Sequence, residues 1–463
     1  MQQPEDVEII LTSEHRYKLH ANVLARHSTF FAGYLTEQRA AKYPPRTLAK
    51  GVIIRWMFQL KRGPTEEEPA GELSPVNLDH NGQPLCPMHV TTLNENGKVP
   101  SKFYKYYESV LYACYGSDIP IGDEGADMMT ALNGAANMLE IADYLGCIPV
   151  ISKPIDIALF NHGQTLFRAI QAAPSGWAGL AMRIKSEMMF KEAVIHLAGN
   201  WNSMKSEDRD ALDAGVRAVV EKHHRILTKK RQGVESRLAS CYPGNMSAPG
   251  EFRPIKREEY AKDILVWIAL SFFRHWFAQQ IIIGKGGAGP DGGFGLYTMI
   301  VKGGDQYMEK PIMNEFHERF PLTKKAMNVL ENHLAEMKVA FKDLVQRSRI
   351  LESLCQLDTH KFPVGYLTCV ELDRDDYPWN REVGDEDDPA AFRSSSAVAE
   401  MGFVAANRPT GNQVVQKNLA AARRHASDDN GPLSPGKHVR SGGGGGMSTS
   451  SDGNSNKRAR NGT

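Results

Sequence analysis

Apolar and polar residues alternate at the start of the chain and then change to a helical spacing. Val7, Ile9 and Leu11 are expected on one face of a short strand, and a second strand returns to His20 after a polar turn. From residue 21 the apolar positions recur at helical spacing, and Ser28 is a typical N-cap for a second helix. This part of the chain therefore predicts two strands followed by two helices.

Further strands and helices are predicted before residue 152. The segment 131–151 carries apolar residues at near-helical spacing, and Gly116 and Gly146 stand where helices must stop. Before them, the apolar run 52–60 predicts a strand, and 89–93 is a second candidate strand. The residues between these two strands are polar, so we expect a sheet hairpin with a loose tip.

After residue 155 the spacing of apolar residues is helical, and the longest regular pattern covers 327–355. Its heptad face consists of Met327, Leu330, Leu334, Met337, Phe341, Leu344, Leu351 and Cys355, with Ser348 as the polar member. Such a face packs either on a partner chain or on another long helix of the same chain. We favour the second arrangement because 207–238 is a helical candidate of similar length.

A glycine-rich segment follows the most apolar helix. Gly284, Gly286 and Gly289 have the G-x-G-x-x-G spacing of a phosphate-binding loop, which needs a strand before it and a helix after it. The residues before Gly284 instead have helical spacing, and Pro290 and more glycines follow. We therefore interpret Gly284 as the residue that ends a helix and 284–304 as a mobile connector, and we predict no nucleotide site.

Composition narrows the class of protein. The chain has 463 residues, which is enough for two or three domains, and six cysteines without a C-x-x-C pair. These cysteines favour a reducing compartment over a disulfide framework. The longest apolar run, 264–273, is too short to cross a bilayer, and the acidic N-terminus does not resemble a secretion signal. We therefore expect no membrane association.

The net charge is +1, but the last part of the chain is basic. Residues 391–463 contain ten Lys and Arg against four Asp and Glu, 10 − 4 = +6, with five consecutive glycines, so we expect a disordered basic tail. Lys457, Arg458 and Arg460 match a short nuclear-import pattern, whose alternative is a solvated charge cluster. Ser434 fits a proline-directed phosphorylation site. The expected localisation is the nucleus, the cytoplasm or both.

Taken in order, the landmarks of the first 152 residues resemble a BTB/POZ domain. The signature residues are Asp6, His20, Val23, Leu24, Ser28 and Phe31. The segment at about 37–101 is longer than this family usually allows, and it resembles the insertion of large fungal BTB proteins. The resemblance implies an α+β domain over 1–152 whose signature residues form a dimer core, and therefore a homodimer.

The same resemblance implies partners. Many BTB domains bind a cullin scaffold through a hydrophobic-x-Glu element after the second helix, for which Leu35 and Glu37 are the candidates; packing at a helix end explains the same residues equally well. Zinc-finger BTB repressors carry a basic residue where this chain has Ala21, and the chain has no zinc fingers or kelch repeats. Direct sequence-specific binding to nucleic acid is therefore not expected.

Candidate catalytic and metal-binding groups are few. Glu192 and His196 lie one helical turn apart, which suits a metal or a general base but is more typical of an ion pair on a helix surface. The histidines at 223–224 are expected to be solvated or at the rim of a bundle, and the C-x-x-H at 86–89 has no second ligand pair. We therefore predict no catalytic residue, no metal and no cofactor.

The sequence thus predicts an α+β BTB/POZ-like N-terminal domain, an all-α helical region over 153–390 and a disordered tail. The predicted function is non-enzymatic protein–protein interaction with self-association, in the role of a substrate adaptor of a cullin-type ubiquitin ligase. The alternative is a nuclear scaffold or transcriptional co-regulator that acts by dimerisation without binding a ligase. Neither the partner nor the biological process follows from the sequence.

Overall fold

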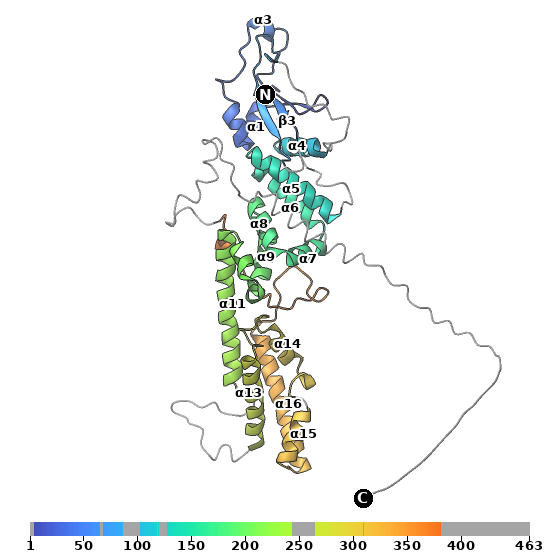
Figure 1. Ribbon diagram of the computed structural model, residues 1–463, viewed down its shortest axis with the longest axis vertical. Helices are drawn as coiled ribbons and strands as arrows, with labels where there is room; N and C mark the ends of the chain where they lie inside the picture. The colour runs from blue at the N-terminus through green and yellow to red at the C-terminus, as the bar shows by residue number, and fades with distance from the viewer. Residues whose placement is uncertain are drawn as a thin grey trace, which may run out of the picture.

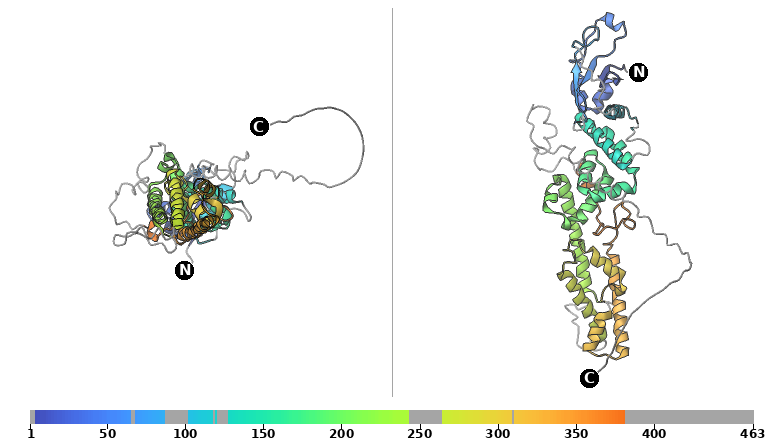
Figure 2. Two further views of the ribbon diagram at one scale, coloured as in Figure 1. Left: turned by 90° about the horizontal axis from the view of Figure 1, so that it is seen from below. Right: turned by 45° about the vertical axis from the view of Figure 1, so that its right-hand side comes forward.

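The computed structural model describes residues 4–64, 68–86, 102–117, 119, 127–242, 264–308 and 310–380. These residues are mostly helical, with a small four-stranded sheet near the N-terminus. The molecule is elongated: the sheet lies at one end, and the helices after residue 264 lie at the other (Figures 1 and 2). Within the described residues, no helix combines the length and the apolar character that a membrane span requires.

The sheet has the strand order β2-β1-β3-β4, with β1 parallel to β3 and the other two pairs antiparallel. The strands are β1 (Val7–Ile10), β2 (Arg16–Leu19), β3 (Trp56–Arg62) and β4 (Glu72–Val76). Ile9 lies opposite Tyr17 on β2 and Phe58 on β3, and all three side chains are buried. The predicted N-terminal hairpin is confirmed.

The sheet differs from the prediction at its other edge. The strand expected over 52–60 begins later, at Trp56, and its neighbour β4 lies in the polar stretch that was expected to form a loose tip. Pro75 made this strand hard to predict, because proline lacks the N–H that a central strand needs. Among the described strands β4 lies at the edge of the sheet, where proline is tolerated. The candidate strand 89–93 lies outside the described residues.

Short helices cover the sheet, and Ser28 separates the first two as predicted. The Ser28 hydroxyl accepts a hydrogen bond from the Phe31 N–H at 3.1 Å and donates one to the Leu145 carbonyl at 2.5 Å. Gly146 has φ +61°, and a Cβ there would lie 1.9 Å from the Thr29 hydroxyl, so only glycine fits this helix end. The helices are α1 (Ala21–His27), α2 (Thr29–Tyr34), α3 (Pro45–Leu48), α4 (Lys102–Ala113) and α5 (Met128–Tyr144).

The middle of the molecule is a stack of helices that continues the core of the sheet region. Its elements are α6 (Ile148–Phe160), α7 (Gln164–Ala172), α8 (Pro174–Ile184), α9 (Glu187–Gly199), η1 (Trp201–Ser203), α10 (Ser206–Asp210) and α11 (Ala214–Ser240). The helix expected over 207–238 is divided in two. Asp213 accepts a hydrogen bond from the Gly215 N–H at 2.8 Å and caps the second helix, which accounts for the division.

The far end is built around α16 (Lys324–Arg347), which packs on α13 (Ile264–Ile282), α14 (Phe294–Lys302) and α11. The rings of Phe273 on α13 and Phe341 on α16 are stacked. The heptad face therefore packs within the chain, as we favoured. It ends earlier than predicted because Arg349 has φ +54° and the helix stops at Arg347. The remaining elements are η2 (Gly304–Gln306) and α15 (Lys310–Arg319).

Residues 348–380, which we call the strap, run back along the middle helices. Their one helical element is η3 (Arg374–Asp376), although 348–380 lie within the helical region predicted over 153–390. The strap nevertheless buries apolar side chains, among them Ile350, Leu357 and Leu367. It passes so close to α9 that a Cβ at Gly199 would lie 2.2 Å from the Leu367 carbonyl oxygen.

Candidate functional site

The six signature residues near the N-terminus hold their own region together. An Asp6 carboxylate oxygen accepts a hydrogen bond from the Ala21 N–H at 2.8 Å, and the His20 N–H donates to the Tyr115 hydroxyl at 2.8 Å. Leu24 and Phe31 are fully buried, Ser28 caps α2 as described above, and Val23 packs against the core at partial exposure. Their contacts are those of core and capping residues, and their role in a dimer stays a prediction.

Leu35 and Glu37 lie directly after α2. Leu35 is the C-cap residue of α2 and packs against the core. Glu37 accepts two hydrogen bonds from the Arg55 guanidinium, at 2.9 and 2.5 Å, and this contact holds the pKa of its carboxyl below the ordinary value. Arg55 also lies over the Trp56 ring. The two residues thus have contacts within the chain that match helix-end packing, and their binding to a cullin stays untested.

Two grooves lie at opposite ends of the molecule. The sheet-end groove, about 590 Å³, is lined by Tyr34, Trp56, Leu78 and Leu85, with Arg39, Arg55 and neighbouring residues. The far-end groove, about 410 Å³, lies between α16 and the turn after α14. It is lined by Met308, Leu334 and Val339, with Lys302, Lys338, Lys342, Asp305, Glu331 and neighbouring residues. Each groove combines apolar side chains with charged ones at its rim.

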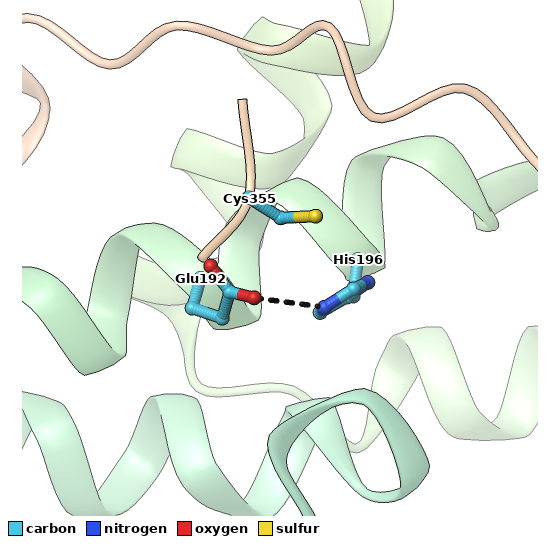
Figure 3. A group of neighbouring side chains, drawn as sticks. All are labelled: Glu192, His196 and Cys355. Atoms are coloured by element: carbon cyan, nitrogen blue, oxygen red, sulfur yellow. Dashed lines mark ion pairs between the residues drawn. The ribbon is translucent and has the colours of Figure 1, made fainter. Parts of the chain in front are cut away.

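Glu192, His196 and Cys355 come together where the strap crosses α9 (Figure 3). The ligand-type atoms of the three side chains lie within 4.8 Å of one another. Glu192 and His196 are 1% and 0% exposed, so the expectation of an ion pair on a helix surface is wrong. This side of α9 is covered by the strap, which is distant from α9 in the sequence. The spacing of residues within one helix cannot predict contact with such a distant segment.

The carboxylate of Glu192 also holds the strap. It accepts hydrogen bonds from the backbone N–H groups of Gln356 at 2.7 Å and Leu357 at 3.0 Å. The His196 Nδ1 lies 2.9 Å from the Tyr366 hydroxyl, and burial raises the pKa of Tyr366 to about 12. Burial likewise raises the pKa of the Cys355 thiol, and the Glu192 carboxylate adds to this shift. Sequence analysis singled out the glutamate and the histidine but did not connect Cys355 with them.

A second polar anchor joins the other end of the strap to α11. His223 Nε2 lies 2.9 Å from Asp376 Oδ2, and Lys222 contacts the other carboxylate oxygen. His223 is 3% exposed, so the prediction that it is solvated or at the rim of a bundle is wrong. Burial lowers the pKa of its imidazole, while Asp376 opposes the shift. Its neighbour His224 is half buried and contacts the Ala198 carbonyl.

The glycine-rich loop packs on α11. The Gly287 N–H donates to a Glu235 carboxylate oxygen, and a Cβ at Gly292 would lie 2.5 Å from the Arg231 guanidinium. Gly284 has φ +75° and follows the end of α13, as predicted. Helix α14 lies within the segment 284–304, so the expected connector is shorter than predicted; its apolar residues bury against α16. The phosphate-binding interpretation still lacks its preceding strand, because α13 is helical.

The remaining predicted sites cannot be placed. Ser434, Lys457, Arg458 and Arg460 lie outside the described residues. Cys86 is exposed, while the histidine of its C-x-x-H pattern lies outside the described residues.

Comparison with known families changes the assignment made from the sequence. A model of the fungal FF domain matches residues 243–347, a range that ends with the last residue of α16. Neither the curated proteins nor the solved structures contain a significant match. The chain is thus similar to the FF domain family in its far-end helices.

The BTB/POZ assignment is contradicted by this result, because the matching family is a different one and lies elsewhere in the chain. The physical reason for the error is that the signature residues perform structural roles that are common to many folds. Asp6 bonds the first residue of a helix, Ser28 caps a helix and Phe31 fills a core. Residues of these types recur in many folds that contain a sheet and helices.

Proposed function

We propose that the chain is a non-enzymatic interaction protein that holds protein partners at the two ends of an elongated scaffold. The observation that carries this proposal is the placement of the two grooves: one lies beside the sheet, and the other lies among the helices of the far end. The function does not rest on the rejected family assignment.

The composition of the sheet-end groove supports binding of a protein. Its wall includes Tyr34 and Trp56, its rim includes Arg39 and Arg55, and Leu85 is 63% exposed. Aromatic residues and arginine are the types that most often dominate the binding energy of protein interfaces. An exposed leucine beside them adds apolar surface that a partner would cover.

The far-end groove lies within the range similar to the FF domain family. Val339 is 60% exposed on α16, and three lysines surround the groove. Between the two grooves, α6 packs on α8, α8 on α9, α9 on α11 and α11 on α16. Because each contact in this series is a packed interface, partners bound at the two ends would be kept apart at a defined distance.

The test uses three single variants of the full chain, each replacing an exposed apolar residue by aspartate. Leu85→Asp alters the sheet-end groove, Val339→Asp alters the far-end groove, and the control Ile226→Asp alters α11, where the side chain is 50% exposed and lines neither groove. Affinity purification with quantitative mass spectrometry compares the proteins retained by each. We expect Leu85→Asp and Val339→Asp to lose different sets of proteins, each by about tenfold or more, and Ile226→Asp to lose neither.

The proposal would be refuted if all variants retained the same set of proteins and had unchanged melting temperatures. A further variant, Leu35→Ala with Glu37→Ala, decides between the two roles predicted from the sequence. Loss of a cullin from this variant alone would identify a ligase adaptor, whereas no cullin in any sample would leave a scaffold. The predicted self-association is tested on the same preparation, since light scattering after gel filtration distinguishes one chain of 51.4 kDa from two.

A further inference from the structure

We propose that Glu192, His196 and Cys355 bind one divalent metal ion, and that zinc is the ion their chemistry fits best. Carboxylate oxygen, imidazole nitrogen and thiolate sulfur are the three ligand types that zinc takes from proteins. All three are offered here within 4.8 Å of one another, two from α9 and one from the strap (Figure 3). This inference is independent of the interaction function proposed above.

The distances are close to those of a tetrahedral site. Two ligand atoms that each lie about 2.0–2.1 Å from a tetrahedral zinc ion are about 3.3–3.4 Å apart. His196 Nε2 and Glu192 Oε1 are 3.4 Å apart. A zinc-bound sulfur would lie about 3.6 Å from such atoms. The Cys355 sulfur is within 4.8 Å of both, so it would need to approach each of them by at most about 1.2 Å.

The histidine has a nitrogen available for a metal. His196 is fully buried, yet its Nε2 has no hydrogen-bond partner within the described residues, because the contact with Glu192 lacks hydrogen-bond geometry. Its other nitrogen, Nδ1, contacts the Tyr366 hydroxyl at 2.9 Å. Histidines that bind metals use the second ring nitrogen in this way, which fixes the tautomer and directs the free lone pair toward the ion.

Charge also favours a divalent ion. A carboxylate, a thiolate and a divalent cation sum to zero, −1 − 1 + 2 = 0, and a neutral set is the least costly to bury. Each Glu192 oxygen accepts one N–H group of the strap, and Oε1, the oxygen nearest His196, has a second lone pair for the ion. An ion pair alone would explain Glu192 and His196. The Cys355 thiol contacts the Ser353 hydroxyl at 2.9 Å and donates to the Leu357 carbonyl at 3.5 Å, and as a zinc ligand it would lose its proton and with it the second contact.

Three protein ligands leave a fourth tetrahedral position for water. Cys355 is half buried, whereas the other two ligands are fully covered, so water and ions reach the site from the side of the thiol. An ion bound here would join residues 192 and 355, which are far apart in the chain, and would fasten the strap to α9. Because it would bind the folded chain in preference to the unfolded one, it would raise the melting temperature.

The first experiment measures metal binding by the full-length chain. After dialysis against a weak chelator, we expect about one zinc ion per chain by elemental analysis, and Co²⁺ in its place should give a thiolate-to-metal absorption band. Cys355→Ser should abolish that band and weaken zinc binding by about 100-fold or more. The matched control Cys369→Ser replaces a buried strap cysteine outside the group and should keep both signals.

A second measurement needs no variant and so remains informative if Cys355→Ser fails to fold. Alkylation of the unmodified chain, followed by peptide mapping, reports each thiol separately. Zn²⁺ should slow the modification of Cys355 at least tenfold and leave the exposed Cys86 unchanged. Absence of bound metal, retention of the cobalt band in Cys355→Ser, or equal alkylation of Cys355 with and without zinc would overturn the proposal.

Discussion

The sheet region and the strap both bury apolar side chains against helices, but the strap is in addition fastened by buried carboxylates. The sheet region has an apolar centre in which Phe31 contacts Phe58 on β3 and Phe30 on its own helix. The strap has almost no regular secondary structure, and it is fastened by buried polar groups, Glu192 at one end and Asp376 at the other. Apolar burial tolerates many partners, whereas a buried carboxylate needs particular donors in particular places.

This difference predicts how each region fails. Loss of an apolar side chain should weaken the sheet region in proportion to the cavity left behind. A substitution that crowds the strap, or a change of charge at its polar contacts, should release the strap while the helices beneath it stay folded. This is expected because local regions of a protein unfold with their own free energies. Three changes test this comparison, and they follow in order of expected effect.

Phe31→Ala should have the largest effect. The side chain is fully buried, and its removal should destabilise the sheet region by about 3–5 kcal/mol. Hydrogen exchange should show lost protection in the strands and α2 with little change in the strap. Phe320→Ala is the control, because that side chain is 62% exposed. Equal loss of protection in the strap would show that the two regions unfold as one unit.

Gly199→Ala should weaken the strap. A Cβ at this position would lie 2.2 Å from the Leu367 carbonyl oxygen, so the strap must shift, at a cost of about 1–3 kcal/mol. Proteolysis and hydrogen exchange should detect release of residues 350–370. Gly33→Ala is the matched helical control: a Cβ there meets no atom within 4 Å, and alanine favours the helix. A strap that stays protected in Gly199→Ala would contradict this account of the close approach.

The smallest effect concerns acid sensitivity at the Asp376 anchor. The groups that face His223 are Asp376, Lys222 and Asp373, and burial lowers the pKa of its imidazole in spite of the two carboxylates. Below the ordinary pKa of 6.5, the unfolded chain therefore binds a proton that the folded chain resists, and stability falls with decreasing pH. The slope from this residue is at most about 1.4 kcal/mol per pH unit.

Thermal melts at about pH 7.5 and pH 5.5 measure this slope. We expect the fall in melting temperature to be smaller in His223→Gln than in the unmodified chain. His275→Gln replaces an exposed histidine and should leave the fall unchanged. An equal fall in melting temperature in all three proteins would show that the buried His223 does not contribute to the acid sensitivity.

Several elements were predictable because their signals are local. The N-terminal hairpin, the cap at Ser28, the helix ends at Gly146 and Gly284 and most of the heptad face agree with the structure. Strand β4 and helix α14 were missed because proline and glycine, which usually mark turns, occur within them. The family assignment failed for a related reason, since capping and core residues are shared by many folds.

By itself, the sequence determined where apolar faces recur and where helices start and stop, because these properties depend on neighbours a few residues away. Only the tertiary structure decided that Glu192 and His196, which were expected on a helix surface, are buried and lie beside Cys355. It also decided that His223 contacts Asp376. Those contacts join residues more than 150 positions apart, through a strap whose sequence has no regular period. Burial and charge pairing depend on which distant segment covers a face, and this is set by the packing of the whole chain.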